Sequence, residues 1–274
     1  MEFHVGGPEV RGGLTVFPVF NGEAVTARGY DLVGSSITVE ERAGAPVVGE
    51  LVVTNRGARP ALVLEGELLE GGWQHRVAAA TVLVAPGASA VIEVRCVEQG
   101  RWSGGGQHVR GGARAPVAIR AAGGQQQVWD RVARYGASPT QSLLDTTRDR
   151  VDAVDDLVGG LRPCAFQSGV LVGVAGQPLL LEVFDSPRIL AAVWEGLLRG
   201  VAVDAVGAPP VETPGRRARR FVRHLPDTSL DPVDGGCGIG FRGESSYTRV
   251  TALHWRGRAV ATVAVNLRHP LVSA

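Results

Sequence analysis

The first 122 residues consist of short apolar runs separated by turns, and this spacing leaves few folds open to the chain. Thr81–Ala85 and Ala90–Val97 flank a Pro-Gly-Ala-Ser turn, and Glu50–Thr54 and Ala61–Glu67 flank a loop that contains glycine and proline. Runs of this length are typical of strands, because glycine and proline supply the backbone angles of the tight turns between them. Short strands joined by tight turns predict an antiparallel sandwich or barrel.

The pattern after residue 122 is mixed. Ser138 and Pro139 form an N-cap and first-turn pair, and the apolar residues after them recur at steps of three and four from Leu143 to Leu161. This predicts one long helix that ends at Gly159-Gly160. Ser186 and Pro187 form a helix-start signal, and the helix is expected to run to about Arg199. A further helix is predicted at 128–135, with strands at 170–174 and 179–184 and a closing hairpin at 247–255 and 258–267.

These patterns predict an α+β fold. An antiparallel, sandwich-like β-rich half at 1–122 is expected to pack with an α+β half at 123–274, whose helices lie on a small antiparallel sheet. No segment of linker composition separates the halves, so one continuous domain stays an alternative.

Composition excludes several classes of function. The chain has no lysine, which rules out Schiff-base chemistry and a P-loop phosphate lysine. Its net charge of +1 argues against nucleic-acid or membrane binding by the whole molecule. Three isolated cysteines and a start without a signal-peptide pattern favour a reducing cytoplasm. The six histidines show no metal-ligand spacing and the glycine motifs fit no cofactor loop, so neither a metal nor a cofactor is expected.

Polar and aromatic side chains gather between residues 65 and 102, in EGELLEGGWQHRV, TVLVAPG and IEVRCVEQGRW. On a strand, Ile92, Val94 and Cys96 share an apolar face, and Glu98 continues that row. A buried carboxylate is costly unless it is paired, hydrated or functional. The same alternation places Glu65 and Glu67 on one face of a strand at 61–67, and Gln74 with Arg76 on another. If these strands adjoin, Arg76 is expected to meet Glu67 or Glu98.

Two interpretations of this cluster stay open. In the functional one, Arg76 and Arg101 bind an anion while Glu67 and Glu98 orient them or act as acid and base. The remaining ligand contacts would come from Gln74, His75 and Trp102, whose ring can stack on a base or sugar. In the structural interpretation, the same side chains form an internal salt bridge with an aromatic plug.

Cys96 also has two interpretations. A catalytic thiolate needs a nearby base, and His75 or His108 could serve as one. A lone cysteine in an apolar strand is more often a small core side chain.

The segments GELLEGGWQHRV, TVLVAP and VRCVEQGRW resemble the signature of the ARG and rhodanese-phosphatase-superfamily-associated protein domain family, with the pattern GExLxGxxQNR, TVLVPP and CxExGRW. The similarity extends through VWDRV, LEVFDSP and the C-terminal hairpin. The chain departs from the pattern at His75, where the family has asparagine, and at Trp73, where lysine is usual. These departures leave in doubt an essential role for that asparagine or a cationic contact. The matching positions are Gly66, Glu67, Gly71, Gln74, Arg76, Cys96, Glu98, Gly100, Arg101 and Trp102.

The resemblance implies a bacterial domain of uncharacterised activity, whose namesakes point to ADP-ribose or phosphoryl metabolism. We therefore predict a cytoplasmic domain that binds an anionic or nucleotide-like small ligand, and leave open whether it is an enzyme. A non-enzymatic module that docks a protein partner is the alternative. A third hypothesis is RNA binding through the run from Arg216 to His224, in which Arg216, Arg220 and Arg223 would share a helix face. A solvated face is the favoured interpretation of that run.

Overall fold

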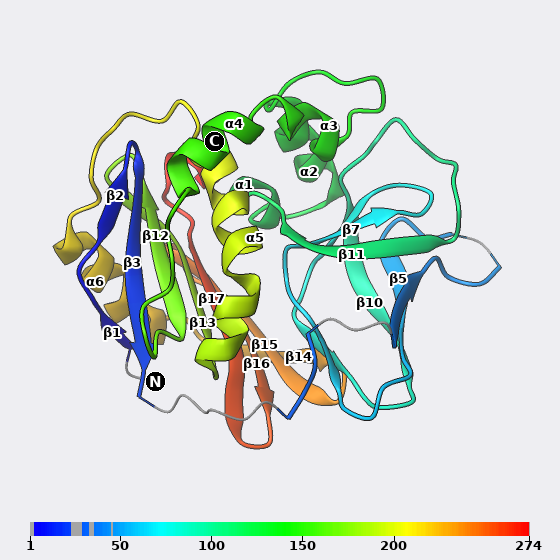
Figure 1. The fold of residues 1–274 in the computed structure, drawn as a ribbon. Coiled ribbons are helices and arrows are strands. Elements are labelled where there is room, and N and C mark those ends of the chain that lie inside the picture. Colours follow the sequence, from blue (N-terminus) through cyan, green and yellow to red (C-terminus); the bar gives the residue numbers. More distant parts are fainter. Residues whose placement is uncertain (1–2, 23–28, 33–35, 45, 274) are drawn as a thin grey trace. The chain divides into compact units, whose positions relative to one another are not determined.

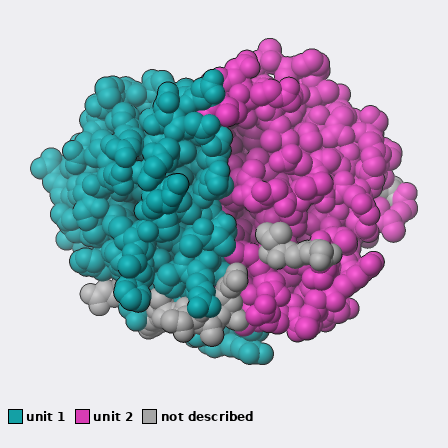
Figure 2. All heavy atoms as spheres, in the orientation of Figure 1, with its two compact units in different colours: residues 1–28, 152–234, 238–274 teal, residues 29–151, 235–237 magenta. Residues whose placement is uncertain are grey.

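The computed structural model describes residues 3–22, 29–32, 36–44 and 46–273 (Figure 1). The chain forms two compact units, coloured separately in Figure 2. Unit 1 comprises residues 1–28, 152–234 and 238–274, and unit 2 comprises residues 29–151 and 235–237. The first segment of unit 1 is therefore separated in the sequence from the rest of that unit by residues 29–151 of unit 2.

Unit 1 is built on a nine-stranded sheet in the order β1-β3-β12-β13-β17-β16-β15-β14, with β2 paired to β3. β3 pairs antiparallel with β12, which joins strands more than 140 residues apart in the sequence. The strands are β1 (Phe3–Val5), β2 (Glu9–Arg11), β3 (Leu14–Asn21), β12 (Gly169–Val174), β13 (Gln177–Phe184), β14 (Asp231–Gly235), β15 (Gly238–Glu244), β16 (Thr248–Trp255) and β17 (Arg258–Asn266).

The helices of unit 1 are α4 (Val151–Val158), α5 (Pro187–Ala205), α6 (Gly215–Arg223) and α7 (Pro270–Ser273), with a short 3₁₀ turn at Leu225–Asp227. α5 packs on β12 and β13, and α6 packs on β13 and β1. Ala218 and Phe221 of α6 share a buried core with Phe17, Leu171 and Leu181 of the sheet. This packing holds the opposite, arginine-rich side of α6 at the surface.

Unit 2 contains a closed barrel of six strands in the order β10-β5-β4-β11-β7-β8, and a two-stranded sheet of β6 and β9. Alternate residues of the barrel strands form one core, to which both strands of the small sheet contribute. Leu68 and Val77 belong to a second core, in which they pack with residues of the helices at 117–148. The elements are β4 (Ile37–Glu40), β5 (Glu50–Asn55), β6 (Ala61–Val63), β7 (Glu67–Gly71), β8 (Arg76–Ala78), β9 (Val82–Val84), β10 (Ser89–Cys96), β11 (Gln107–Arg114), α1 (Val117–Arg120), α2 (Gln125–Ala133) and α3 (Leu143–Arg148).

The predicted α+β class is confirmed, and most predicted elements are present. The helix-start signal at Ser186 is real, because its hydroxyl accepts a hydrogen bond from the Arg188 N–H at 3.3 Å. The closing hairpin pairs β16 with β17 across Arg256 and Gly257, both of which have positive φ. That conformation matches the type I′ turns that join two-stranded hairpins.

Two predicted elements are wrong as single units. The long helix expected after Ser138 begins later, at Leu143, and is divided into α3 and α4. The hydroxyls of Thr146 and Thr147 donate to the Leu143 carbonyl near the break. Such bonds compete with the helix and bend it. The strand expected at 61–67 is interrupted at Gly66, whose φ is 80°, so the two glutamates do not share one strand face.

Candidate functional site

Glu98 lies at the centre of the predicted cluster, within unit 2. Its carboxylate accepts hydrogen bonds from the Arg101 guanidinium at 2.6 Å and from the His75 backbone N–H at 2.9 Å. Arg101 also donates to the carbonyls of Gly71, Gly72 and Ser103. The Glu98 side chain is almost fully buried, so these bonds tie the segment after β10 to the segment before β8. We call this group the Glu98 network.

The charges of the Glu98 network stabilise one another. Burial alone would raise the pKa of the Glu98 carboxyl, but the bonds from Arg101 and the His75 N–H outweigh it and hold that pKa below its usual range. The same carboxylate raises the pKa of Arg101. Burial lowers the pKa of His75, whose Nδ1 accepts a hydrogen bond from the Gly71 N–H at 2.9 Å and is therefore unprotonated. The geometry thus favours a neutral His75.

Gln74 and Trp102 complete the edge of this cluster. The Gln74 amide donates to the Glu98 carbonyl at 2.9 Å, while its oxygen is buried without a hydrogen bond from the described residues. Trp102 is 47% exposed and packs edge-on against Trp73, with 5.3 Å between ring centroids. The Arg76 guanidinium lies 5.9 Å from the centroid of the Trp102 ring. Trp102 therefore covers Arg76 and presents its remaining surface to solvent.

Arg76 is fully buried, and none of its three side-chain nitrogens has a hydrogen-bond partner among the described residues. It makes no hydrogen bond to Glu67 or Glu98 within this set, so the contact expected between Arg76 and one of these glutamates is not a hydrogen-bonded ion pair. Burial lowers the pKa of Arg76, against the opposing effect of nearby Cys96 and Glu41. Such a group is costly to bury.

Cys96 lies directly opposite Arg76 in the β8–β10 pair and is completely buried. Burial raises the pKa of the Cys96 thiol, although Arg76 acts in the opposite direction. The thiol form is favoured, which is the environment of a core cysteine and not that of an activated nucleophile.

Glu67 belongs to a separate ion pair. Its two carboxylate oxygens accept hydrogen bonds from Arg110 at 2.6 and 2.9 Å, and one of them also lies 3.3 Å from the Leu64 N–H. Both charged side chains are about 6% exposed. The structure therefore brings Glu98, His75, Gln74 and Arg101 together, and gives Glu67 a different partner.

The close approach of the His108 ring to the backbone explains why residue 72 is a glycine. A Cβ at this position would lie 2.1 Å from the His108 ring, and its φ of 56° disfavours other residues. His108 lies beside Glu41, with 3.2 Å between its Nε2 and the carboxylate, and Glu41 also accepts the Trp73 N–H at 3.0 Å. The turn at 71–75 is thus fixed by packing and hydrogen bonds from several directions.

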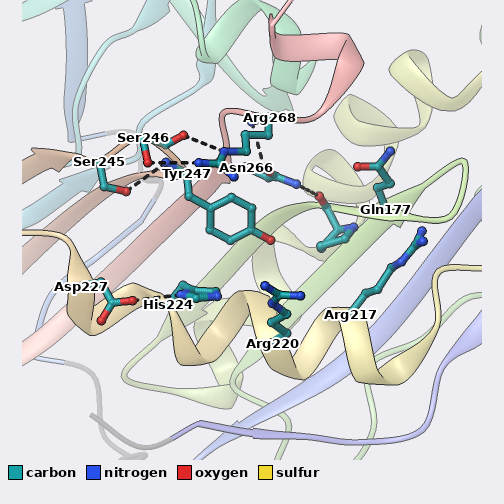
Figure 3. A pocket seen from close by; sticks show the side chains of 11 residues that line it. Gln177, Arg217, Arg220, His224, Asp227, Ser245, Ser246, Tyr247, Asn266 and Arg268 are labelled. Carbon is teal, nitrogen blue, oxygen red and sulfur yellow. Dashed lines mark hydrogen bonds and ion pairs between the residues drawn. The ribbon is translucent and has the colours of Figure 1, made fainter.

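An open pocket lies elsewhere, within unit 1, and Figure 3 shows its side chains. Its volume is about 680 Å³. We call it the arginine pocket; its lining residues are Gln177, Pro178, Arg217, Arg220, His224, Asp227, Ser245, Ser246, Tyr247, Asn266 and Arg268. They come from β13, from α6 and the turn after it, from the residues just before β16, and from the end of β17 with the residues that follow it.

The three arginines of the pocket differ in their bonding. Arg268 donates to the carbonyl of Ser246 at 3.0 Å and to its hydroxyl at 3.2 Å. Arg217 donates through one nitrogen to the Gly176 carbonyl at 2.7 Å. Arg220 forms no hydrogen bond or ion pair with the residues that the structure describes. Its guanidinium is therefore the one most available to an anionic ligand.

Tyr247 and His224 form the aromatic part of the pocket. Their rings meet edge-on with 5.2 Å between centroids, and the Arg268 guanidinium lies 5.5 Å from the Tyr247 centroid. Burial raises the pKa of the Tyr247 phenol, while Arg220 and Arg268 act to lower it. Nδ1 of His224 lies 2.9 Å from an Asp227 carboxylate oxygen. In Figure 3 the phenol oxygen of Tyr247 points toward the side of the pocket where Arg220 lies.

Sequence reasoning missed this pocket because its residues come from separate parts of the chain. The run of arginines from residue 216 was the available signal. The helix face predicted from it, with Arg216, Arg220 and Arg223, is not the face that lines the pocket. Arg217, Arg220 and His224 do so, at a spacing of three and four residues on one side of α6. No local pattern connects this helix with Tyr247 and its neighbours in the closing hairpin.

In the described part of the chain, no group of three or more histidine, cysteine, aspartate or glutamate residues is placed to hold a metal ion. No helix within the described residues has the length and apolar character needed to cross a membrane.

Comparison with known proteins gives one match. Searches of curated proteins and of solved structures found no similar protein. One family model matches residues 2–265, which is nearly the whole chain. The chain therefore belongs to the ARG and Rhodanese-Phosphatase-superfamily-associated Protein domain family.

Proposed function

We propose that the protein binds a phosphorylated small molecule in the arginine pocket. The observation that carries this proposal is Arg220, a pocket cation without a bonded partner among the described residues, flanked by Arg217 and Arg268. Guanidinium groups match the geometry of phosphate oxygens, which they bind through paired hydrogen bonds.

The charge of the lining supports a phosphate monoester over a simple carboxylate. Three arginines and Asp227 leave the lining with a net charge of +2 when His224 is neutral. A phosphate monoester carries a charge of about −1.5 to −2 at neutral pH, whereas a carboxylate carries a single negative charge. The pocket can therefore neutralise a phosphoryl group almost completely.

The size of the pocket supports a ligand larger than free phosphate. Its volume of about 680 Å³ lies within the range of roughly 300–1,000 Å³ that small-molecule sites occupy. Gln177, Asn266 and Ser245 add polar groups, and Tyr247 adds an aromatic wall. These features fit a phosphosugar or nucleotide, in line with the ADP-ribose or phosphoryl metabolism that the family name suggests.

We place this binding in the cytoplasm. Cys96, Cys164 and Cys237 are all free thiols, and two of them are exposed. Exposed thiols persist most readily in a reducing compartment.

Calorimetric titration with inorganic phosphate, ribose 5-phosphate and ADP-ribose tests the proposal. We expect at least one phosphorylated ligand to bind, and Arg220→Ala to weaken its binding by about tenfold to a hundredfold, as for loss of one charge-assisted contact. Arg216→Ala is the matched control, because Arg216 lies on the same helix outside the pocket lining.

Three results would contradict the proposal. One is equal weakening by Arg220→Ala and Arg216→Ala, which would indicate attraction by the general charge of α6. Another is retention of binding in Arg220→Ala with loss in Arg76→Ala, which would move the ligand to the barrel cluster of unit 2. The third is that no phosphorylated ligand binds, which would favour the alternative of a protein-interaction module.

A further inference from the structure

We propose that the arginine pocket hydrolyses phosphate monoesters through a phosphoryl group carried transiently on Nε2 of His224. This inference rests on the proposed function, because the phosphoryl group must first bind beside Arg220. It adds a reaction and a nucleophile to what would otherwise be a binding site.

The contact with Asp227 determines which nitrogen of His224 is reactive. A carboxylate only accepts hydrogen bonds, so Nδ1 must carry the proton that lies in the 2.9 Å contact with Asp227. The lone pair of neutral His224 is then on Nε2. In Figure 3 this second nitrogen lies on the side of the ring that faces Arg220. The carboxylate also stabilises the positive charge that the ring acquires when Nε2 forms a bond.

The orientation of the ring is fixed from a second direction. Tyr247 packs edge-on against His224 at an interplanar angle of 77°, and the same tyrosine packs edge-on against buried Phe221. A nucleophile that is held in place loses less entropy in reaching the reactive geometry than a free side chain does.

The neighbouring cations suit phosphoryl transfer. Arg217, Arg220 and His224 are spaced by three and four residues along one side of α6 and its end, so a phosphoryl group on the two arginines lies next to the histidine. Catalysis of phosphoryl transfer depends mainly on positioning and on stabilising charge on the equatorial oxygens. Arginine guanidinium groups supply both.

The first step replaces one bond to phosphorus with another. Nε2 of His224 attacks the phosphorus atom, the P–O bond to the alcohol breaks, and the leaving oxygen takes the phenolic proton of Tyr247. The products of this step are the alcohol, the phosphorylated imidazole and the Tyr247 phenolate. Arg220 and Arg268 stabilise the phenolate, because both are close enough to affect this phenol.

The second step regenerates the pocket. A water oxygen bonds to phosphorus, the N–P bond breaks, and the water proton returns to Tyr247. The sum of both steps is a phosphate monoester plus water giving an alcohol plus inorganic phosphate. No oxidant, reductant or other co-reactant is required.

The test measures turnover and the covalent intermediate in the full chain, with p-nitrophenyl phosphate and glycerol 3-phosphate as probes. We expect phosphate release from both, and a mass increase of one phosphoryl group at His224 in protein quenched at alkaline pH. His224→Asn should abolish both signals while inorganic phosphate still binds. His254→Asn is the control, because His254 lies on β16 outside the pocket lining.

Tyr247→Phe tests whether Tyr247 supplies the proton that the leaving oxygen takes. Nitrophenolate is a good leaving group that needs no proton, so this variant should slow release from p-nitrophenyl phosphate much less than release from glycerol 3-phosphate. Release from glycerol 3-phosphate should fall by about 10²–10⁴-fold, the usual contribution of a general acid. An equal fold-loss for both substrates, relative to wild type, would remove Tyr247 as the general acid.

Other outcomes distinguish this inference from the proposed function. If phosphate binds but neither probe is cleaved, the reaction is wrong and the binding site stands. Turnover that persists in His224→Asn, or turnover without label on His224, also overturns the reaction. If phosphate and the phosphorylated ligands do not bind at all, both proposals fail together.

Discussion

Replacing Arg76 with methionine should stabilise the protein. The substitution removes a guanidinium that is fully buried, with no hydrogen-bond partner in the described residues for any of its three nitrogens. A buried donor left unsatisfied costs about 1–3 kcal/mol. Methionine has a similar length and an adaptable apolar side chain, so it can fill the space beneath Trp102.

The expected gain is limited by the charge that Arg76 leaves behind. Glu41 is close enough to oppose the lowering of the Arg76 pKa, and it loses this favourable neighbour in the variant. Replacing buried ionic groups with apolar ones of similar volume stabilises proteins by about 1–4 kcal/mol, and we expect about 1–2 kcal/mol here. For a chain of this size, each kcal/mol corresponds to a rise in melting temperature of roughly 2–4 °C.

Arg101→Met is the matched comparison. Arg101 donates to three backbone carbonyls and to Glu98, so its removal leaves a nearly buried carboxylate without its cation. We expect a loss of about 3–5 kcal/mol, as for breaking a buried ion pair from one side. Urea unfolding followed by tryptophan fluorescence measures both variants, because Trp73 and Trp102 lie at the cluster.

The opposite order of stabilities would refute this reasoning. If Arg76→Met loses more than about 2 kcal/mol, the guanidinium has partners that stabilise it in the folded protein, such as ordered water or a bound anion. The buried arginine would then be a positive contributor to the barrel, and the cluster would again be a candidate site.

The remaining predictions concern the same unit. Gly72→Ala should destabilise it by about 2–4 kcal/mol in urea unfolding, since the new Cβ would meet His108 and adopt a positive φ; an unchanged midpoint would contradict this. The pKa of Glu98 is lowered on folding, so its stabilisation is complete above the unfolded pKa of about 4.3 and is lost as pH falls through the folded value. Glu98→Gln should therefore flatten the acid side of the stability–pH curve, and a curve parallel to wild type would exclude this role. The lowered pKa of His75 predicts a further loss of stability below about pH 6.5, which His75→Asn should reduce in the same titration.

Local patterns predicted the secondary structure well, because they depend on neighbouring residues. The strand alternation of Ile92, Val94 and Cys96 and the hairpin turn at Arg256-Gly257 are both present in the structure. The failures arose where single residues interrupt a periodic run. Gly66 ends one predicted strand through its backbone conformation, which hydrophobic periodicity does not record.

The candidate site could be predicted only in part. Density of polar residues located the Glu98 network, since its members are close in sequence or on paired strands. The same density did not reveal that Glu67 pairs with Arg110, because the register between β7 and β11 decides that contact. The arginine pocket depends on tertiary packing of α6 beside the closing hairpin, which no local pattern encodes.

The interleaved order of the two units has a consequence for biosynthesis. β3 emerges from the ribosome long before its neighbour β12, and unit 2 is translated almost completely between them. Closing so long a loop carries a large entropic cost unless the intervening chain has already become compact. We expect the barrel to fold first during translation and shorten the effective distance, so that substitutions weakening it slow the later completion of the nine-stranded sheet and, with it, of the arginine pocket.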